Sequence, residues 1–403
     1  MMNKKFKIAI INSVYRYGST GRICFELNEF LQKSGFETRV FFGRKMKVKQ
    51  TEKNVTNFSL PFSVPIHALS SRILDNSGFC SFFSTKKLVK MLSKFKPDLI
   101  ISHNLHGYYL DIKILLKWIA NSETKSIFVF HDCWNFTGHC AHFANKKCEK
   151  WKTQCYRCPC KNEYPSSVLF DNSKRNYLLK KSLFSKIKDG VIVTPSIWMS
   201  NLVKESFFKK NDIRVINNGI DTKIFHKTNI YFEDNKQFSD KKIILCVASV
   251  FNEKKGLNDI LSLGKLISDD FQIIIVGKIN PNIPLIDSIY HIDRLNSPEE
   301  LAMLYSSAFV FFNPTYDDNY PTVNLEALCC GCPVISYKTG GSCEMIDQRF
   351  AVEKGDYIGA FEMMQKMANG ELNYSFQDDI LFSKQVMLTN YLNLIKELLC
   401  IKK

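Results

Sequence analysis

The residues best suited to chemistry lie in one segment of the second half, NPTYDDNYPTVNLEALCCGCPVI, over positions 313–335. An apolar strand is expected to end where the segment begins, and a polar loop with two carboxylates, Asp317 and Asp318, follows it. Proline suits the first turn of a helix, where its missing N–H costs nothing, so a helix is expected to start near Pro321. Acidic side chains thus precede a helix start directly.

The first turn of this expected helix suits a ligand that carries both a phosphate and a diol. The free N–H groups of Thr322 and Val323, with the positive end of the helix dipole, form a ready site for an anion. Glu326, about one turn further along, can accept hydrogen bonds from a diol such as a ribose. A solvated loop followed by an ordinary carboxylate near a helix start would give the same pattern.

A lysine in the same half could neutralise such a phosphate. Lys255-Gly256 follows a predicted strand over Ile243–Ala248 and stands at the start of a predicted helix over Leu257–Ile267. A cation there would stabilise negative charge that develops on a phosphate group. Lys254 is a second cation beside it.

The first half places histidines at the ends of two predicted strands. His131 ends the strand expected over Ser126–His131, and Asp132 follows it. The residues that follow the strand Asp98–Ser102 are His103, Asn104 and His106. Ligands of open α/β folds bind at the carboxyl ends of the strands, so these side chains are expected to line a site. A lone histidine is nevertheless more often structural than catalytic.

A cysteine cluster forms a separate candidate site, in a polar loop over 133–160. Cys140, Cys148, Cys155 and Cys158 could close a tetrahedral structural zinc site that holds together a loop too polar to bury itself. Their spacing is not a pair of clean Cys-x2-Cys knuckles, and a set of reduced, partly buried thiols is the alternative. No catalytic zinc is expected.

The elements that must position these residues alternate between strand and helix. Continuous apolar strands separated by helices indicate a parallel sheet covered on both faces. In the first half the pattern runs from a strand over Phe6–Asn12, through a turn at Gly18–Gly21 and a helix over Arg22–Lys33, to a last strand over Val191–Thr194. It breaks near residue 217, and a polar candidate linker over 228–240 follows before the alternation restarts.

At 403 residues the chain exceeds the size of one hydrophobic core, so two domains are expected. We predict an α/β fold of two facing Rossmann-like domains, over 1–217 and 218–383, with a cleft between them. A helix within 384–403 is expected to cross back to the first domain.

The composition, 45% hydrophobic and 23% charged residues, is globular and excludes a disordered chain. Charge is unevenly divided: residues 1–227 hold 39 Lys and Arg against 16 Asp and Glu, whereas the remainder holds 16 against 23. Basic residues attract nucleic acid and anionic lipid alike, and a solvated lysine-rich surface is equally compatible with the count.

The apolar run Ile8–Ile11 is too short for a signal-peptide core, and no run of eighteen apolar residues follows anywhere. The protein is therefore expected in the cytoplasm, with its cysteines reduced.

Together these residues resemble the retaining glycosyltransferases of family 4, which have the GT-B architecture. The segment 313–335 is similar to their acidic-x7-acidic motif, with Asp318 as the first acid and Glu326 as the second. The resemblance covers nearly the whole chain and is strongest to the branch that makes capsule and colanic-acid polysaccharides. Further motifs in the family's order are Gly18-Ser-Thr-Gly21, Pro97-Asp98, His103-Asn104-Leu-His106-Gly107, His131-Asp132-Cys-Trp134, Thr194-Pro195-Ser196, Asn218-Gly219-Ile-Asp221, Lys255-Gly256, Asn313-Pro314 and Gly340-Gly341.

The resemblance implies roles for these positions. Glu326 would hold the nucleotide ribose, Asp318 would lie beside the donor sugar, and Lys255 would face the diphosphate. The other residues implied on the donor side are Gly18, Gly21, Ser249, Lys254, Asn319, Thr322 and Val323. Asp stands at 318 where the family usually has Glu, Asn319-Tyr320-Pro321 replaces Gly-aromatic-Gly, and Ser249 stands in the place of an arginine.

On the acceptor side the resemblance implies a role for His103, Asn104 and His106, and it makes His131 a binding or orienting residue near the donor sugar. It implies catalysis without a bound metal, a nucleotide-sugar donor, and a saccharide acceptor. The basic first half favours a lipid-linked acceptor and peripheral contact with the anionic inner face of the membrane.

Two other functions are compatible with parts of the sequence. A basic, zinc-containing nucleic-acid-binding protein would explain the charge and the cysteines but would leave Asp318 and Glu326 without a purpose. An epimerase of the same fold would act on the nucleotide-sugar alone. A glycosyltransferase accounts for more of the motifs, and no nucleic-acid partner is expected.

Overall fold

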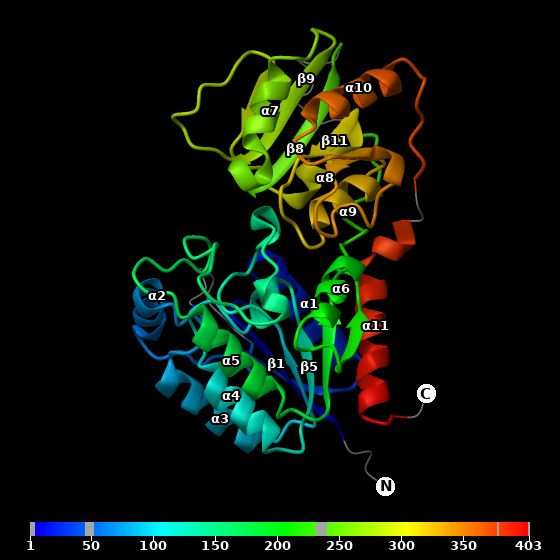
Figure 1. Cartoon of the computed structure of the whole chain (residues 1–403). Coiled ribbons are helices and arrows are strands. Elements are labelled where there is room, and N and C mark those ends of the chain that lie inside the picture. Colours follow the sequence, from blue (N-terminus) through cyan, green and yellow to red (C-terminus); the bar gives the residue numbers. More distant parts are fainter. Residues whose placement is uncertain (1–4, 45–51, 231–239, 377–378, 402–403) are drawn as a thin grey trace. The chain divides into compact units, whose positions relative to one another are not determined.

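The computed structural model describes residues 5–44, 52–230, 240–376 and 379–401 (Figure 1). The chain divides into two compact units: unit 1 is Met1–Ile216 with Leu388–Lys403, and unit 2 is Asn217–Met387. Most of the expected linker over 228–240 lies outside the described residues. Among the described residues, no helix combines the length and the apolar character needed to cross a bilayer.

Unit 1 is built on a parallel sheet whose described strands have the order β3-β2-β1-β4-β5-β6-β7. The strands are β1 (Lys7–Asn12), β2 (Glu37–Phe42), β3 (Val55–Asn57), β4 (Leu99–Ser102), β5 (Lys125–Val129), β6 (Gly190–Thr194) and β7 (Asp212–Val215). All residues of β4 are buried, as are all but the first of β1, because helices cover both faces of the sheet.

The helices of unit 1 connect these strands (Figure 1). They are α1 (Gly18–Lys33), α2 (Ser63–Leu74), α3 (Phe82–Phe95), α4 (Ile112–Ala120), α5 (Ser173–Phe184) and α6 (Ile197–Glu205). The Cys-rich loop holds short 3-10 turns at Cys133–Asn135, Ala144–Lys146 and Lys150–Lys152. Buried residues of this loop, among them Trp134, Phe136 and Trp151, belong to a hydrophobic core of unit 1.

Unit 2 repeats the architecture with a parallel sheet in the order β10-β9-β8-β11-β12-β13. Its strands are β8 (Lys242–Val250), β9 (Phe271–Lys278), β10 (Ile289–Ile292), β11 (Val310–Asn313), β12 (Val334–Tyr337) and β13 (Ala351–Val352). Its helices are α7 (Leu257–Gly264), α8 (Pro298–Ser307), α9 (Thr322–Cys329) and α10 (Tyr357–Ala368). The expected fold class of two Rossmann-like domains with parallel sheets is confirmed.

Three expected elements of unit 1 were wrong in detail. The sheet does not close at β6, because α6 and the exposed edge strand β7 follow, and β7 has no apolar run to reveal it. Strand β5 ends at Val129, so His131 lies just beyond it, although the N–H of Phe130 still donates to Val193 O. Helix α1 begins at Gly18, so the glycine segment is its first turn.

The last helix, α11 (Lys384–Leu398), packs mostly within unit 1. Its buried residues Tyr391, Leu394 and Ile395 face inward, and Glu397 pairs with Arg214 at 2.9 Å. Most of α11 therefore belongs to the same compact unit as β1 and α1.

Each sheet reverses its strand order at one point. In unit 1 the reversal falls between β1 and β4, and in unit 2 between β8 and β11. Open parallel sheets bind ligands at the carboxyl ends of the strands at such a switch point. The loops that follow these four strands are therefore the places to look for a site in each unit.

Candidate functional site

In unit 2 the two loops at the switch point are joined by an ion pair. Lys255 ends a 3-10 turn that follows β8, and Asp318 lies in the loop that follows β11. The Lys255 Nζ donates to Asp318 Oδ2 at 2.7 Å and lies 3.5 Å from Thr315 Oγ1. The two side chains are 35% and 22% exposed, so a ligand can still reach them. The sequence predicted both residues but not their contact.

Backbone packing fixes the position of both loops. Gly256 has φ +70°, and a Cβ there would lie 2.2 Å from Pro314 O. Gly340 has φ +55°, and a Cβ there would lie 1.8 Å from Asp318 O. Neither position admits a side chain without displacing the loop that it touches. The predicted Lys255-Gly256 and Gly340-Gly341 motifs thus act as supports for the acidic loop.

Helix α9 starts at Thr322, with Pro321 as its cap residue in extended conformation. Asn319 and Glu326 are buried, whereas Thr322 and Val323 are half-buried at the helix start. The first backbone N–H groups of a helix have no acceptor within it, so the start of α9 presents donors and partial positive charge.

Glu326 lies on α9 beside Tyr305 of α8. Burial, together with the negative charge of Glu326, raises the pKa of Tyr305 well above its ordinary value. Glu326 itself is 8% exposed. Only a small part of Glu326 is therefore accessible from outside.

A buried amide network that sequence reasoning missed holds α9 against the sheet. Asn313 Nδ2, at the end of β11, donates to Asn324 Oδ1 at 2.7 Å, and Asn324 Nδ2 donates to Ser342 O at 3.0 Å. Buried amides that satisfy one another fix the geometry of the elements that they join. The sequence signal was present, since Asn324 interrupts the apolar face of α9.

The remaining predicted donor-side residues of unit 2 lie nearby. Lys254 O accepts a hydrogen bond from Tyr316 N at 2.8 Å, so its backbone joins the same two loops. Ser249 is exposed near the end of β8 and stands where the resembling family has an arginine.

In unit 1 two of the predicted histidines are in direct contact. His103 Nδ1 lies 2.9 Å from His131 Nε2, and the rings stack with planes 14° apart. Burial lowers the pKa of His131 to about 4, against the opposing effect of Asp132, and lowers that of His103 well below its ordinary value. Both imidazoles are therefore neutral at pH 7 and can serve as hydrogen-bonding groups rather than charges.

The third histidine of this group pairs with a carboxylate that was noticed only as a neighbour of His131. His106 Nε2 lies 2.7 Å from Asp132 Oδ2, and His106 Nδ1 lies 3.2 Å from the Tyr164 hydroxyl. The pKa of Asp132 is about 2: burial would raise it, but the interactions with His106, His142 and the Trp134 N–H together outweigh that effect. Asp132 therefore orients His106 and stays ionised.

The glycine segment and Asn104 belong to the same edge of the sheet. Asn104 Nδ2 donates to Thr20 Oγ1 at 3.3 Å, which ties the first turn of α1 to the loop after β4. A Cβ on Gly21 would lie 3.2 Å from Val14 Cγ2, and Gly18 has φ +66°. The structure thus brings Gly18, Gly21, Asn104 and the histidines to the switch point of unit 1.

The four cysteines proposed for zinc are not arranged as one site. Cys140 lies close to Cys158 and Cys160, whereas Cys155 accepts a hydrogen bond from Gly138 N at 3.2 Å. Burial raises the pKa of Cys155 to about 11, which keeps it a thiol. Within the described parts of the chain, no group of three or more His, Cys, Asp or Glu residues could hold a metal ion.

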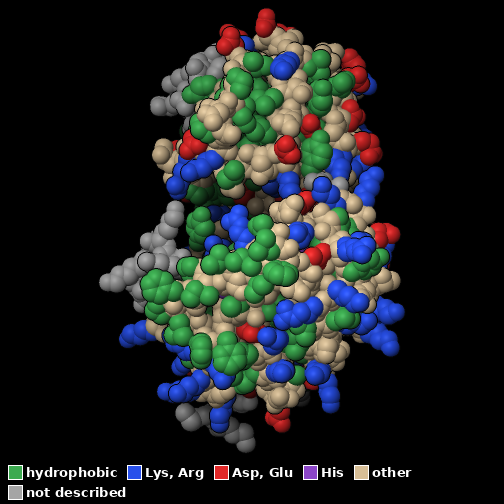
Figure 2. Space-filling view, turned by 60° about the vertical axis from the view of Figure 1, so that its left-hand side comes forward, with side chains coloured by type: hydrophobic (Ala, Val, Ile, Leu, Met, Phe, Trp, Pro, Cys, Tyr) green, Lys and Arg blue, Asp and Glu red, His purple; other side chains and the backbone are tan. Residues whose placement is uncertain are grey.

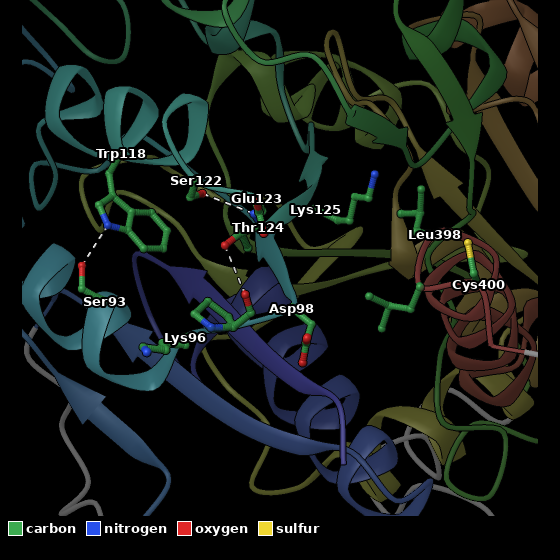
Figure 3. Close-up of a pocket in the computed structure, with 12 residues that line it drawn as sticks. Ser93, Lys96, Asp98, Trp118, Ser122, Glu123, Thr124, Lys125, Leu398 and Cys400 are labelled. Carbon is green, nitrogen blue, oxygen red and sulfur yellow. Dashed lines mark hydrogen bonds between the residues drawn. The ribbon is translucent and has the colours of Figure 1, made fainter. Parts of the chain in front are cut away.

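An open pocket of about 490 Å³ lies at the opposite edge of the unit 1 sheet (Figure 3). Asp98 and Lys125 stand at the amino ends of β4 and β5, and Cys400 follows α11. Trp118 on its wall donates to Ser93 Oγ at 2.9 Å. None of the predicted site residues lines this pocket, and it lies away from the edge where such sheets bind ligands.

Two family models match the chain, one in each half. The model described as Glycosyltransferase Family 4 matches residues 20–224, and the model described as Glycosyl transferases group 1 matches residues 228–362. The first alone covers half of the chain.

Among curated proteins, WcaC of Escherichia coli (strain K12), described as a glycosyl transferase of colanic acid biosynthesis, is 24% identical over 327 residues, which are 75% of this chain and 77% of WcaC. The capsular polysaccharide biosynthesis glycosyltransferase CapM of Staphylococcus aureus is 22% identical over 48% of this chain and 56% of its own length.

Solved structures share the fold. Sucrose-phosphate synthase from Thermosynechococcus elongatus has a TM-score of 0.72 at 15% identity, covering 99% of this chain and 100% of its own. The Anabaena protein Alr3699/HepE, solved with UDP and glucose, has a TM-score of 0.64 at 12% identity, covering 97% and 100%. Because the first family model alone covers half of the chain, the chain belongs to Glycosyltransferase Family 4, and it is a glycosyltransferase of the GT-B fold.

Proposed function

We propose that this glycosyltransferase moves a sugar from a nucleotide-sugar donor to a lipid-linked saccharide, with retention of the anomeric configuration, during synthesis of a surface polysaccharide. The observation that carries the proposal is the ion pair of Lys255 and Asp318 at the switch point of unit 2. The polysaccharide context rests on the relatives WcaC and CapM.

For the donor, unit 2 offers one group for each part of a nucleotide-sugar. The N–H groups at the start of α9 and the ammonium of Lys255 suit the diphosphate. The carboxylate of Glu326 suits the ribose diol. Asp318, held by Lys255 and by the backbone at Gly340, suits a hydroxyl of the donor sugar.

The reaction breaks the bond between the anomeric carbon and the phosphate oxygen and forms a bond from that carbon to an acceptor oxygen. Lys255 would neutralise the charge that develops on the leaving diphosphate, which lowers the barrier only if the cation is already in position. The Lys255–Asp318 contact supplies that position in the free enzyme.

Retention through a covalent intermediate needs a carboxylate nucleophile about 5 Å from a second carboxylate. Neither Asp318, paired with Lys255, nor Asp132, paired with His106, is a free nucleophile. We therefore favour attack on the face that the leaving group vacates, with the acceptor proton passing to a phosphate oxygen. The neutral imidazoles of His103 and His131 would then bind sugar hydroxyls.

For the acceptor, we propose a saccharide carried on a lipid at the anionic inner face of the membrane. The excess of 39 basic over 16 acidic residues in the first 227 positions supports this proposal. Each basic residue near an anionic bilayer contributes roughly 1 kcal/mol of binding, so a few of them facing one way suffice for reversible attachment.

A product assay tests the proposal. The protein is incubated with a panel of nucleotide-sugars, with and without a polyprenyl-diphosphate-linked sugar, and nucleoside diphosphate release is measured. We expect release only when both substrates are present, and an anomeric coupling constant in the product that matches that of the donor. A changed donor sugar formed without acceptor would instead establish an epimerase, and an inverted linkage would refute retention.

A further inference from the structure

An exposed apolar stripe runs along α2 in unit 1. Phe62 is the N-cap residue of this helix, and Ile66, Leu69 and Ile73, which are spaced by three or four residues, lie on one face of it. They are 78%, 59%, 62% and 36% exposed, respectively. The opposite side of the helix carries His67 and Ser71, which are buried. Helix α2 thus packs by its polar side and presents its apolar side outward.

A second apolar segment continues the stripe at the C-terminal end of α2. Val168 N donates to Arg72 O at 2.7 Å, and Phe170 N donates to Ile73 O at 3.1 Å. The side chains of Val168, Leu169 and Phe170 are all more than half exposed. Residues 168–170 are therefore held beside the helix by backbone hydrogen bonds while their side chains point away from the core.

A third apolar group lies at the other end of α2. Leu60 N donates to Ser84 Oγ at 3.0 Å, which joins the segment before α2 to the first turn of α3. Phe82 and Phe83 in that turn are exposed, with ring centroids 5.3 Å apart.

The exposed apolar residues of α2, 82–83 and 168–170 together form what we call the apolar face. Figure 2 shows hydrophobic side chains gathered on the surface of unit 1, with lysines and arginines among and around them. Apolar surface of this extent on a soluble protein marks a place of contact with a partner or a membrane.

Charge around the apolar face is almost entirely basic. The exposed basic residues on α2, on α3 and at the start of α5, which follows residues 168–170, are Arg72, Lys86, Lys87, Lys90, Lys94, Lys174 and Arg175. The one acid in the sequence between 58 and 96, Asp75, is buried against His139. Asp171 is the exposed acid that adjoins residues 168–170, and it accepts hydrogen bonds from the backbone of Cys158 and Ser173.

We propose that the apolar face docks unit 1 on an anionic lipid bilayer, with its apolar side chains entering the interfacial region and its basic border meeting the headgroups. Helices with one apolar face and a cationic border bind membranes in this way. A second copy of the chain fits less well, because pairing the same face with itself would bring two basic borders together. The inference rests on the proposed function only for the lipid-linked acceptor that docking would bring within reach.

Docking of this kind differs from attachment by lysines alone in its response to salt. The screening length is about 3 Å at 1 M salt, so purely electrostatic attachment is lost there, whereas apolar insertion persists. The full chain is therefore sedimented with vesicles of phosphatidylglycerol and phosphatidylcholine at 0.1 M and 1 M salt. We expect measurable binding at both, and binding to pure phosphatidylcholine vesicles that is weaker by about tenfold or more.

The test variant is Ile66→Gln with Leu69→Gln, which removes the centre of the stripe but keeps good helix formers at exposed positions. Vesicle binding at 1 M salt should fall by about tenfold or more. The matched control is Ile358→Gln, at an exposed position (51%) on α10 of unit 2, which should bind as the unaltered protein does.

Three results would overturn the docking proposal. One is equal vesicle binding by the double variant and the unaltered protein, and another is no vesicle binding by either. The third is a dimer of the unaltered protein in light scattering that the double variant converts to monomer, because the face would then serve a second copy. Nucleoside diphosphate affinity, measured by calorimetry on the same variants, should stay unchanged. If the unaltered protein bound no nucleoside diphosphate, that result would count against the proposed donor site rather than against docking.

Discussion

Lys255 and Asp318 are 63 residues apart in sequence, yet their side chains meet at 2.7 Å where the loops after β8 and β11 come together. The contact places a cation and a carboxylate at the one point where the strand order of unit 2 reverses. Because both side chains are partly exposed, their pairing contributes no more than about 1 kcal/mol to the stability of the fold. Such a pair is better suited to a ligand than to holding the loops together.

Lys255→Ala should therefore lower the activity while leaving the stability of the fold nearly unchanged. Loss of a group that stabilises developing charge typically lowers kcat by roughly 10² to 10³. The melting temperature should change little, because the loops remain joined through Tyr316 N and Lys254 O. Steady-state kinetics and thermal unfolding of the same preparation check this. Lys278→Ala, at a neighbouring exposed position, serves as a charge-matched control. An equal loss of kcat in that control would show that the position of Lys255 does not matter for catalysis.

Glu326→Gln should weaken nucleoside diphosphate binding by about tenfold or more, because charge-assisted hydrogen bonds are worth roughly 1.5–3 kcal/mol each. The substitution keeps the size of the side chain at this buried position. Tyr305→Phe is the control, since it removes the neighbouring hydroxyl and leaves the carboxylate intact. Calorimetry on both variants measures the difference. Unchanged affinity in Glu326→Gln would refute a ribose contact.

The sequence predicted the parallel sheets because their strands are continuous apolar runs, and it predicted the site loops because polar residues follow those runs. It could not predict which loops meet. The pairing of Lys255 with Asp318, or of His106 with Asp132, depends on strand order, and strand order is a property of the whole sheet. The family resemblance identified most of these residues, whereas the topology of the sheets determines which of them are in contact.

Helix α2 shows a different limit of sequence reasoning. The spacing of Phe62, Ile66, Leu69 and Ile73 is that of a helix buried along one side, and periodicity alone would place this stripe in the core. The structure places His67 and Ser71 inside instead, where His67 accepts a hydrogen bond from Gly78 N at 3.1 Å. Hydrophobic periodicity identifies one face of a helix, but it does not say whether that face meets the protein or something outside it.

Gly340→Ala should disturb the donor site through the backbone. Its Cβ would lie 1.8 Å from Asp318 O, so the acidic loop must shift. Gly370→Ala is the matched control, because Gly370 also has positive φ (+76°) but nothing lies within 4 Å of its Cβ position. Both variants should lose roughly 1–2 kcal/mol of stability from backbone strain at positive φ, Gly340→Ala should lose more because of the clash, and only Gly340→Ala should lose donor affinity. Equal donor affinity in the two variants would show that the position of Asp318 is unimportant.

In the Cys-rich loop the spacing of the cysteines in the sequence favours a zinc site, whereas the arrangement of their sulfur atoms does not. The sequence predicts structural zinc on Cys140, Cys148, Cys155 and Cys158, which would give near-stoichiometric zinc by elemental analysis, whereas the arrangement of the described residues predicts none. If zinc is present, Cys148→Ser should lower both the zinc content and the melting temperature, while Cys80→Ser outside the cluster should change neither. Metal-free protein whose melting temperature is the same in both variants would leave the loop as a set of reduced thiols.

The buried imidazole of His131 should make stability depend on pH. Its pKa is about 4 in the folded protein and near 6.5 in the unfolded chain, so between these values the unfolded chain binds a proton that the folded protein does not. The stability that a neutral His131 contributes is therefore fully present above pH 6.5 and is lost as the pH falls toward 4. The His131→Gln variant has no titratable side chain at this position, so it does not lose stability in this way as the pH falls.

The measurement is the difference in melting temperature between the unaltered protein and His131→Gln, at pH 7.5, 6.0 and 4.5. Comparing the two proteins cancels the carboxylates that titrate in both. The difference should move in favour of the variant as the pH falls, with most of the change between pH 6.5 and 4.5. A difference that stays constant over this range would mean that His131 keeps an ordinary pKa. An imidazole of the stacked His103–His131 pair would then be protonated as the pH falls.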